Sequence, residues 1–473
     1  MGLITKIKEW FSMLFLSKAK EEFQIVPITS QEMDSFVRRC LSIYEGNPEW
    51  VMNPFNEDIK TVNFAKSVCS EISRLTTLAI GVKIDGGARA KWMQEQIEKI
   101  YFNLRHWVEY GAAAGTVILK PNGSGIDCLT PDRFQITDME DGEISGAVFI
   151  DQRYDAANDK WFTRLEYHRF EGSGDQRQYV ISNRCYKGDS KNDSGKYVPI
   201  AETPWSVLEE DVVAVNVEKP LFGVFRTPAA NNIDIDSPLG MPIFSEALEE
   251  LRDLDVAYSL NAVEIEDSRR MILLDSDQVM LNNGWKPSAQ NFEYGKEQLA
   301  LPKYVRIVNG SDDGDIYHEI NPNLNTDMRL TGLNALLSQI GFKCGFSNGY
   351  FVFNEKTGMM TATDVEADDR RTIQLIKDMR DKLEDCLNSL LYALDKFADA
   401  YGLAPVGTYE PHYDFGDITY SYAEDKAHWL SYANANKIPF WYYLVKFENM
   451  TEEEAKALVE QAEPKETLFG GAE

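Results

Sequence analysis

The stretch DVEADDRRTIQLIKDMRDKLEDCLNSLLYALDKFADAY (364–401) decides the architecture expected of this chain. Its apolar residues recur every three, four or seven positions, which predicts one amphipathic helix. At about 1.5 Å per residue this helix would be about 55 Å long. Because that far exceeds the usual globular helix, it predicts either a coiled-coil seam or a spine that crosses a large assembly. The apolar positions are Val365, Thr372, Ile376, Met379, Leu383, Cys386, Leu390, Leu394, Phe397 and Tyr401.

Two further helices are predicted upstream, on either side of a segment with strand and turn patterns. Pro242 opens the first, since proline is tolerated in a first helical turn, and its apolar residues recur as far as Ile265. From 271 to about 322 the pattern breaks into short strands and turns. Helical periodicity returns at Met328, with Gly341 as the predicted stop.

The first half of the chain is predicted to mix helices and strands. Residues 61–78 and 91–110 have helical periodicity, and 80–84 alternates like a strand. Gly111 closes the second helix, either as a C-cap or at a tight approach to a neighbour. From 116 to about 217, short strands are separated by turn clusters, which is typical of a β-rich meander. The fold class expected is therefore α+β.

The C-terminal residues predict two more helices. An aromatic one contains Trp441, Tyr442, Leu444 and Phe447, and a second opens at Thr451. Thr451 and Glu454 have the spacing of a capping box, so this helix start is well marked.

Composition limits the class of protein. The 473 residues are 44% hydrophobic and 26% charged, and 76 acidic against 48 basic residues leave a net charge of −28. A chain this acidic is not expected to bind around nucleic acid by counterion release. A like-charged surface would repel phosphates and let nucleic acid pass without binding. The six cysteines stand singly, which excludes a zinc or disulfide scaffold and favours an intracellular, reduced chain. The apolar run 10–16 is too short to span a bilayer.

No catalytic motif is convincing. The loop GDSKNDSGKY (188–197) has glycines seven apart and Tyr197 where a phosphate loop needs Ser or Thr. The five histidines have no metal-ligand spacing. Asp234 and Asp236 form an Asp-x-Asp pair that could hold Mg²⁺ in a nuclease or transferase, and the competing interpretation is a helix-entry loop. We therefore expect no catalytic residue, cofactor or metal, and keep the metal-dependent enzyme as the alternative.

The block from Asp236 to Tyr401 resembles the portal proteins of tailed bacteriophages, in particular the siphophage type from phages and prophages of Gram-positive bacteria. The segments SPLGMPIFSEALEELRDLDVAYS (237–259) and INPNLNTDMRLTGLNALLSQIGFKCGFSNGYFVFNEKTGMMTATDV (320–365) carry the resemblance, together with the long helix. Asp364 stands where this family usually has Glu. The N-terminal half is similar at NFAKSVCSEI (63–72) and GAAAGTVILKP (111–121), so the resemblance covers most of 50–425.

The resemblance implies a structural protein without an active site, one of typically twelve subunits in a ring around a DNA tunnel at a capsid vertex. It also implies the following division of the chain. Residues 1–240 would form the N-terminal part of the wing, 241–270 the first stem helix, 271–322 the clip, 323–343 the second stem helix, 344–361 the tunnel-loop region, 362–425 the long helix with the C-terminal part of the wing, and 426–473 the crown.

Two sets of residues are implied as functional. Asn354, Glu355, Lys356, Thr357 and Gly358 would face double-stranded DNA from the tunnel loop, where the competing interpretation is a solvated hairpin turn. Acidic residues of the clip would dock basic partner surfaces or simply be solvated: Asp275, Asp277, Asp312, Asp313 and Asp315. The implied partners are the terminase, scaffold and major capsid proteins, and head-completion or tail proteins. Assembly would take place in the bacterial host cytoplasm and the protein would end in the virion.

Overall fold

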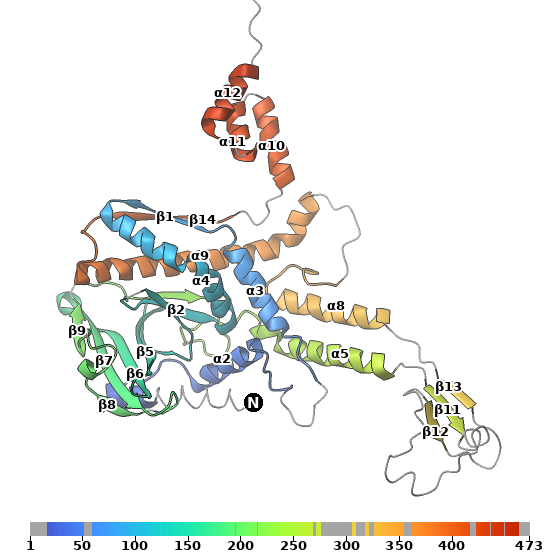
Figure 1. Ribbon diagram of the computed structural model, residues 1–473, viewed down its shortest axis with the longest axis horizontal. Coiled ribbons are helices and arrows are strands. Elements are labelled where there is room, and N and C mark those ends of the chain that lie inside the picture. The colour runs from blue at the N-terminus through green and yellow to red at the C-terminus, as the bar shows by residue number, and fades with distance from the viewer. Residues whose placement is uncertain are drawn as a thin grey trace, which may run out of the picture. The chain divides into compact units, whose positions relative to one another are not determined.

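The structure is a computed structural model that confirms an α+β protein (Figure 1). It describes residues 17–51, 59–123, 125–193, 195–214, 216–267, 271–275, 305–308, 317–320, 326–353, 362–416, 422–435, 437–448 and 450–462. These fall into two compact units. The first contains residues 1–77 and 81–413, and the second contains 78–80 and 414–473.

The meander predicted from 116 to 217 is present. Its main sheet is antiparallel, in the order β4 (Phe134–Glu140), β5 (Glu143–Asp155), β6 (Lys160–Glu171), β7 (Gln178–Gly188) and β8 (Lys196–Val198). The short strand β9 (Asp211–Ala214) also pairs with β7. The loop 188–197 is the turn between β7 and β8, so the phosphate-loop alternative is replaced by a hairpin.

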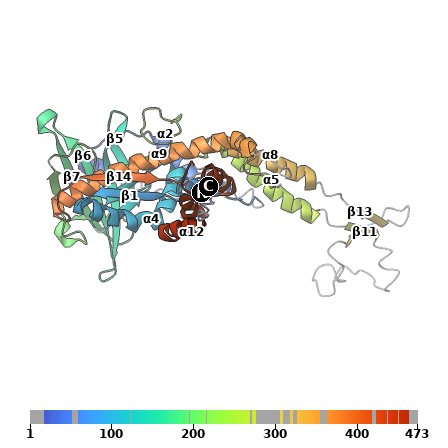
Figure 2. The same cartoon turned by 90° about the horizontal axis from the view of Figure 1, so that it is seen from above.

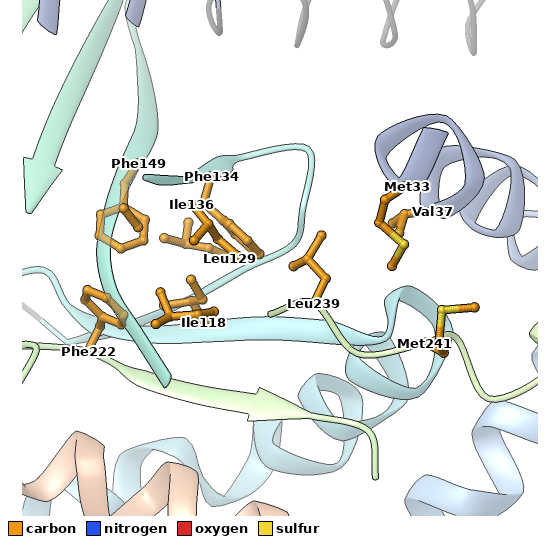
Figure 3. Packing of buried hydrophobic residues seen from close by; sticks show 12 residues of the cluster. Met33, Val37, Ile118, Leu129, Phe134, Ile136, Phe149, Phe222, Leu239 and Met241 are labelled. Carbon is orange, nitrogen blue, oxygen red and sulfur yellow. The ribbon is translucent and has the colours of Figure 1, made fainter. Parts of the chain in front are cut away.

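A second antiparallel sheet has the order β10 (Gly223–Arg226), β2 (Thr116–Pro121) and β3 (Ile126–Leu129). Its apolar side faces β4 and β5, and Figure 3 shows Ile118 and Leu129 against Phe134 and Phe149. Helix α2 (Gln31–Tyr44) adds Met33 to the same core. This apolar layer joins the two sheets and α2 into one body.

The predicted helices of the first half are α3 (Phe64–Thr76) and α4 (Ala88–Ala114), with β1 (Gly81–Gly86) between them. β1 pairs with β14 (Tyr409–Asp414). Helix α4 continues through Gly111, so the C-cap expectation is wrong and Gly115, at φ 81°, ends it. The expected tight approach is right, because a Cβ at Gly111 would enter the ring of Phe225.

The long helix is α9 (Ala362–Tyr401), which has 40 residues and begins two residues earlier than the predicted 364–401. From Thr372 to Leu394 its apolar stripe is buried, including Ile376, Met379 and Leu383. It packs along β2, β10, α3 and α4, and a Cβ at Gly223 of β10 would collide with the backbone of Cys386. Within the described part of the first unit, α9 is therefore a spine rather than a coiled-coil seam.

The two helices expected around the β segment are α5 (Leu248–Asp267) and α8 (Thr326–Lys343). The first begins six residues later than Pro242 predicts, after a 3₁₀ turn at Ser245–Ala247. The second continues past Gly341, where a Cβ would lie 3.0 Å from the ring of Phe351. Between them in the chain, β11 (Met271–Asp275) pairs with β12 (Val305–Val308) and β13 (Tyr317–Ile320).

The second unit contains α10 (Tyr422–Asn434), α11 (Phe440–Glu448) and α12 (Glu452–Ala462). Its small core is aromatic, with Tyr443 and Phe447 buried against Trp429. The capping box is confirmed: the Thr451 hydroxyl accepts from the Glu454 N–H at 3.3 Å, and Glu454 accepts from the Thr451 N–H at 3.1 Å. Among the helices of the described residues, none is long and apolar enough to cross a membrane.

Candidate assembly surfaces

Helices α5 and α8 form an antiparallel pair, side by side in both views (Figures 1 and 2). The pair is closed by one carboxylate near the start of α5. Glu250 forms an ion pair with Lys343 at 2.5 Å and accepts a hydrogen bond from the side-chain amide of Gln339 at 3.0 Å. Because both partners lie in the last turns of α8, Glu250 sets which turn of one helix faces which turn of the other.

The buried side of α5 is fastened to the segment before α3. The Asp255 carboxylate accepts from Trp50 Nε1 at 2.9 Å and from the Val62 N–H at 2.8 Å. One turn later the Ser259 hydroxyl accepts from the Lys60 N–H at 2.8 Å. These bonds orient α5 on the first unit.

Each helix of the pair also carries an apolar stripe turned toward solvent. On α5, Val256, Leu260 and Val263 recur at intervals of four and three, and Leu260 is 51% exposed. On α8, an exposed stripe of apolar and small residues contains Met328, Gly332, Ala335 and Phe342, and Met328 is 77% exposed. Residues at these intervals lie on one side of a helix. The two stripes have the pattern of helices that pack on further helices.

The segment from 344 to 353, after α8, is an irregular loop that is anchored to the first unit at several points. Phe346 is buried and packs on Tyr350 and Phe351, whose ring contacts Phe64 of α3 at 5.1 Å between centroids. The Ser347 N–H donates to the Thr372 hydroxyl at 2.9 Å. The first part of the expected tunnel-loop region 344–361 is therefore held against the first unit through Phe346, Ser347 and Phe351, and the rest of that expectation stays a prediction.

Most of the residues singled out from the sequence lie outside the described part of the chain. This holds for the tunnel-loop residues Asn354, Glu355, Lys356, Thr357 and Gly358, and for Asp277, Asp312, Asp313 and Asp315. Asp275 is placed by its backbone at the end of β11, opposite Val308. Their roles remain predictions.

The Asp-x-Asp pair is built into a loop at the start of α2. The Asp234 carboxylate accepts from the N–H of Ser30, the N-cap residue of α2, at 2.9 Å. This hydrogen bond holds the pKa of Asp234 below its usual value. Asp236 is exposed, and no three potential ligands gather among the described residues. Asp234 therefore links this loop to the start of α2, a different helix from the one that the sequence predicts to begin at Pro242.

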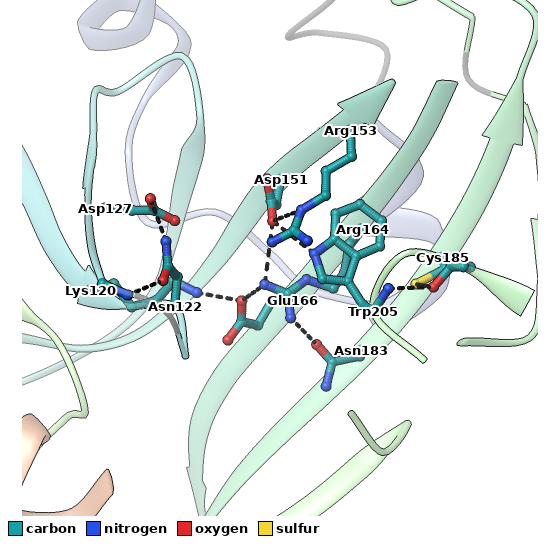
Figure 4. A network of polar contacts seen from close by, with 12 residues as sticks. Lys120, Asn122, Asp127, Asp151, Arg153, Arg164, Glu166, Asn183, Cys185 and Trp205 are labelled. Atoms are coloured by element: carbon teal, nitrogen blue, oxygen red, sulfur yellow. Dashed lines mark hydrogen bonds and ion pairs between the residues drawn. The ribbon is translucent and has the colours of Figure 1, made fainter. Parts of the chain in front are cut away.

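A buried cluster of charges lies on β2 and β6 (Figure 4). Glu166 binds Lys120 at 2.5 Å and Arg164 at 2.8 Å, and its other oxygen contacts His168 Nε2 at 2.9 Å. Burial alone would raise the pKa of Glu166, but the two cations hold it well below its usual value. Burial lowers the pKa of His168, so the ring is neutral at pH 7, with Nδ1 facing the Tyr179 hydroxyl at 2.9 Å.

This cluster contains the residue types of an acid–base catalytic site, but a substrate could not reach them. Lys120, Arg164, Glu166 and His168 are all buried, and each is already paired. A catalytic group must reach a substrate, so the cluster is a structural one that ties β2 to the main sheet. Sequence analysis missed it because Lys120 and Glu166 meet only through the sheet arrangement.

The cysteine thiols are equally unsuited to nucleophilic chemistry. All six are free, and all but Cys128 are buried. Burial raises the pKa of Cys40 and of Cys128 to about 12 and that of Cys185 to about 11. Reactive thiols need a lowered pKa, so none of these is a candidate nucleophile.

Two buried arginines were also missed. Arg89 donates to the carbonyls of Asp395 and Pro405 at 2.8 and 2.9 Å and pairs with Asp399, which holds the end of α9 to the start of α4. Arg380 donates to the last carbonyls of α3 at Leu75 and Thr76. A signal was present for Arg89, since it lies four residues before Met93 on the buried stripe of α4.

No protein-family model matches the chain, and no curated protein matches it. A solved structure to which it is similar is described as the neck of a native GTA particle computed with C12 symmetry. The match covers 89% of this chain and 98% of that chain, with 11% sequence identity and a TM-score of 0.38. A likeness of this extent assigns no function.

Proposed function

We propose that this chain is the portal subunit of a tailed phage, which forms a ring at one capsid vertex and passes DNA through its centre. The observation that carries the proposal is the α5–α8 pair. Each helix buries one side within its own unit and leaves a second apolar stripe exposed, and the pair brackets a small three-stranded segment. Helices built in this way can be covered by the same helices of neighbouring copies, and a repeated unlike contact closes a ring.

The charges of the pair suit such packing. Helix α5 carries seven carboxylates, Glu249, Glu250, Asp253, Asp255, Glu264, Glu266 and Asp267, against the single cation Arg252. Helix α8 is close to neutral, with Arg329 and Lys343 against Asp327, and Lys343 already pairs with Glu250 of its own copy. An acidic α5 next to the α8 of a neighbour is therefore favoured over α5 next to α5. The acidity of the whole chain also suits a tunnel in which phosphates must not stick.

In this proposal the α5–α8 pair is the stem, 271–322 the clip and α9 the spine of the wing. The terminase would dock during packaging, scaffold and capsid proteins would hold the ring in the shell, and head-completion or tail proteins would follow. The ring would use no cofactor and would remain in the virion.

The stripe gives a direct test. The purified chain is expected to have a light-scattering mass of many times 53.8 kDa. Leu260→Asp places a charge in the α5 stripe and should reduce the mass to that of a monomer or small oligomer. Val406→Asp is the matched control, because Val406 is 88% exposed but lies outside α5 and α8, and it should leave the mass unchanged. If Leu260→Asp assembles like the wild type, the stripe is not the contact.

A further inference from the structure

The exposed side of α4 carries aromatic side chains that no other described element of the chain covers. Phe102, His106 and Tyr110 recur every four residues on the solvent side, and Phe102 is 84% exposed. The rings of Phe102 and His106 contact each other at 6.3 Å between centroids. We call this side of α4, from 99 to 110, the aromatic face. Exposed aromatics grouped in this way mark interaction sites.

The aromatic face is also locally basic in a chain with a net charge of −28. Lys99 and Arg105 are exposed on it, while Glu109 is buried and accepts from Tyr44 at 2.7 Å. At its edge, one turn before Phe102, the exposed Glu98 accepts from the Gln94 side chain at 3.1 Å. Among the described residues, Arg105 has no ion pair. The nearby Glu71 is occupied by Arg74 and the Tyr350 hydroxyl. A partner for this face should therefore be apolar and acidic.

The chain contains such an element in the loop NNIDID (231–236). It presents Ile235, which is 87% exposed, beside the exposed carboxylate of Asp236. The loop is held in one shape: the Asn231 side chain accepts from the N–H groups of Ile233 and Asp234 at 3.0 and 2.9 Å. The bond from Ser30 to Asp234 fixes it to α2. A rigid loop loses little entropy on binding.

We propose that the 231–236 loop of one copy docks on the aromatic face of the next, with Ile235 against Phe102 and Asp236 toward Arg105. This rests on the proposed function, because it names the partner as a second copy of this chain. The occupant is argued from complementarity: a basic aromatic surface and an acidic aliphatic loop occur on the same chain. The loop is bonded to Ser30 at the start of α2, whereas Tyr44 at the other end of α2 is bonded to Glu109 of the aromatic face, so the loop and the face lie at opposite ends of α2. Two unlike surfaces so placed give a contact that can repeat around an axis.

The test uses the full-length chain and charge reversal in three variants. Arg105→Glu and Asp236→Arg each place like charges in the contact, and each should raise the ring dissociation constant about tenfold or more. The double variant again places opposite charges in the contact, with the acidic group now on α4 and the basic group on the loop. It should recover most of the wild-type assembly. Lys66→Glu, an exposed reversal on α3, is the matched control and should change little.

A second measurement does not depend on affinity. Phe102→Cys combined with Ile235→Cys, treated with a short bismaleimide, should give a ladder of covalent multimers, whereas either single variant should not. If the wild type forms rings but the reversals and the double cysteine behave like controls, this docking surface is wrong and the ring proposal stands. If the wild type forms no ring, either alone or with the scaffold protein present, the proposed function itself fails.

Discussion

The carboxylate of Glu250 and the ammonium of Lys343 lie 2.5 Å apart and join the start of α5 to the end of α8. This pair joins residues that are 93 positions apart in the chain, and it holds the two helices in register. It is also incompletely satisfied, because Glu250 Oε2 is buried and finds no hydrogen-bond partner among the described residues. The pair is therefore sensitive to loss of either partner.

Lys343→Met should destabilise the first unit by about 1–2 kcal/mol, between the values for exposed and for buried pairs, because Glu250 keeps only Gln339. Urea unfolding followed by circular dichroism measures this. Lys382→Met is the control, since Lys382 and Asp385 pair loosely on the surface of α9 at 3.5 Å. Equal effects of the two variants would contradict the role given to Glu250.

Glu166→Gln should cost about 3–5 kcal/mol of unfolding free energy, because it leaves Lys120 buried without an anion and Arg164 with only Asp151, 3.6 Å away. Replacing Lys120 and Glu166 together by methionine should recover part of the loss, since the unpaired buried ammonium of Lys120 is then gone and Arg164 keeps Asp151. Equilibrium unfolding measures the free energy of unfolding of the single and of the double variant. A double variant less stable than Glu166→Gln would show that the cluster does more than pair charges.

Stability should fall as the pH is lowered from 7 to 5. The pKa of His168 is lowered in the folded chain, so the unfolded chain takes up its proton first, near the ordinary value of about 6.5. The unfolded state then binds more protons, and folding loses up to about 1.4 kcal/mol per pH unit from this residue. Unfolding measured at several pH values should show the slope, and His168→Gln should reduce it. If His168→Gln leaves the slope unchanged, the pH dependence of stability comes from other groups.

Gly111→Ala should destabilise the first unit by about 1–3 kcal/mol, because the new methyl group enters the ring of Phe225. Thermal unfolding checks this. Combining it with Phe225→Leu, which shortens the opposing side chain, should return part of the stability. If Gly111→Ala is neutral on its own, α4 and β10 are not in the close contact described.

The sequence predicted elements that depend on local pattern. The stripe of α9, the two helices around the β segment and the Thr451–Glu454 capping box all have their signal within a few turns of one helix. Gly341 does not end its helix as predicted, and of the two readings of Gly111 the tight approach holds and the C-cap does not, because a glycine required for packing and a glycine that stops a helix look the same in one sequence. Only the positions of Phe225 and Phe351 distinguish them.

The candidate surfaces were less accessible to sequence analysis. Exposure of Leu260, Phe102 and Ile235 depends on which faces the tertiary fold covers, and apolar periodicity alone does not separate a core stripe from an unpartnered one. The loop at Asp234 showed its acidic pattern plainly, but its bond to Ser30 joins residues 204 positions apart. The carboxylate pair therefore suggested a metal site that the contacts do not favour.

Electron microscopy of the purified full-length chain tests the central claim most directly. The account predicts rings with a central hole, with helices α5 and α8 of successive copies packed side by side. If the chain stays a monomer by itself, the same imaging with the scaffold protein present should give the rings. A monomer under both conditions that cuts DNA in the presence of Mg²⁺ would contradict the account and restore the metal-dependent enzyme.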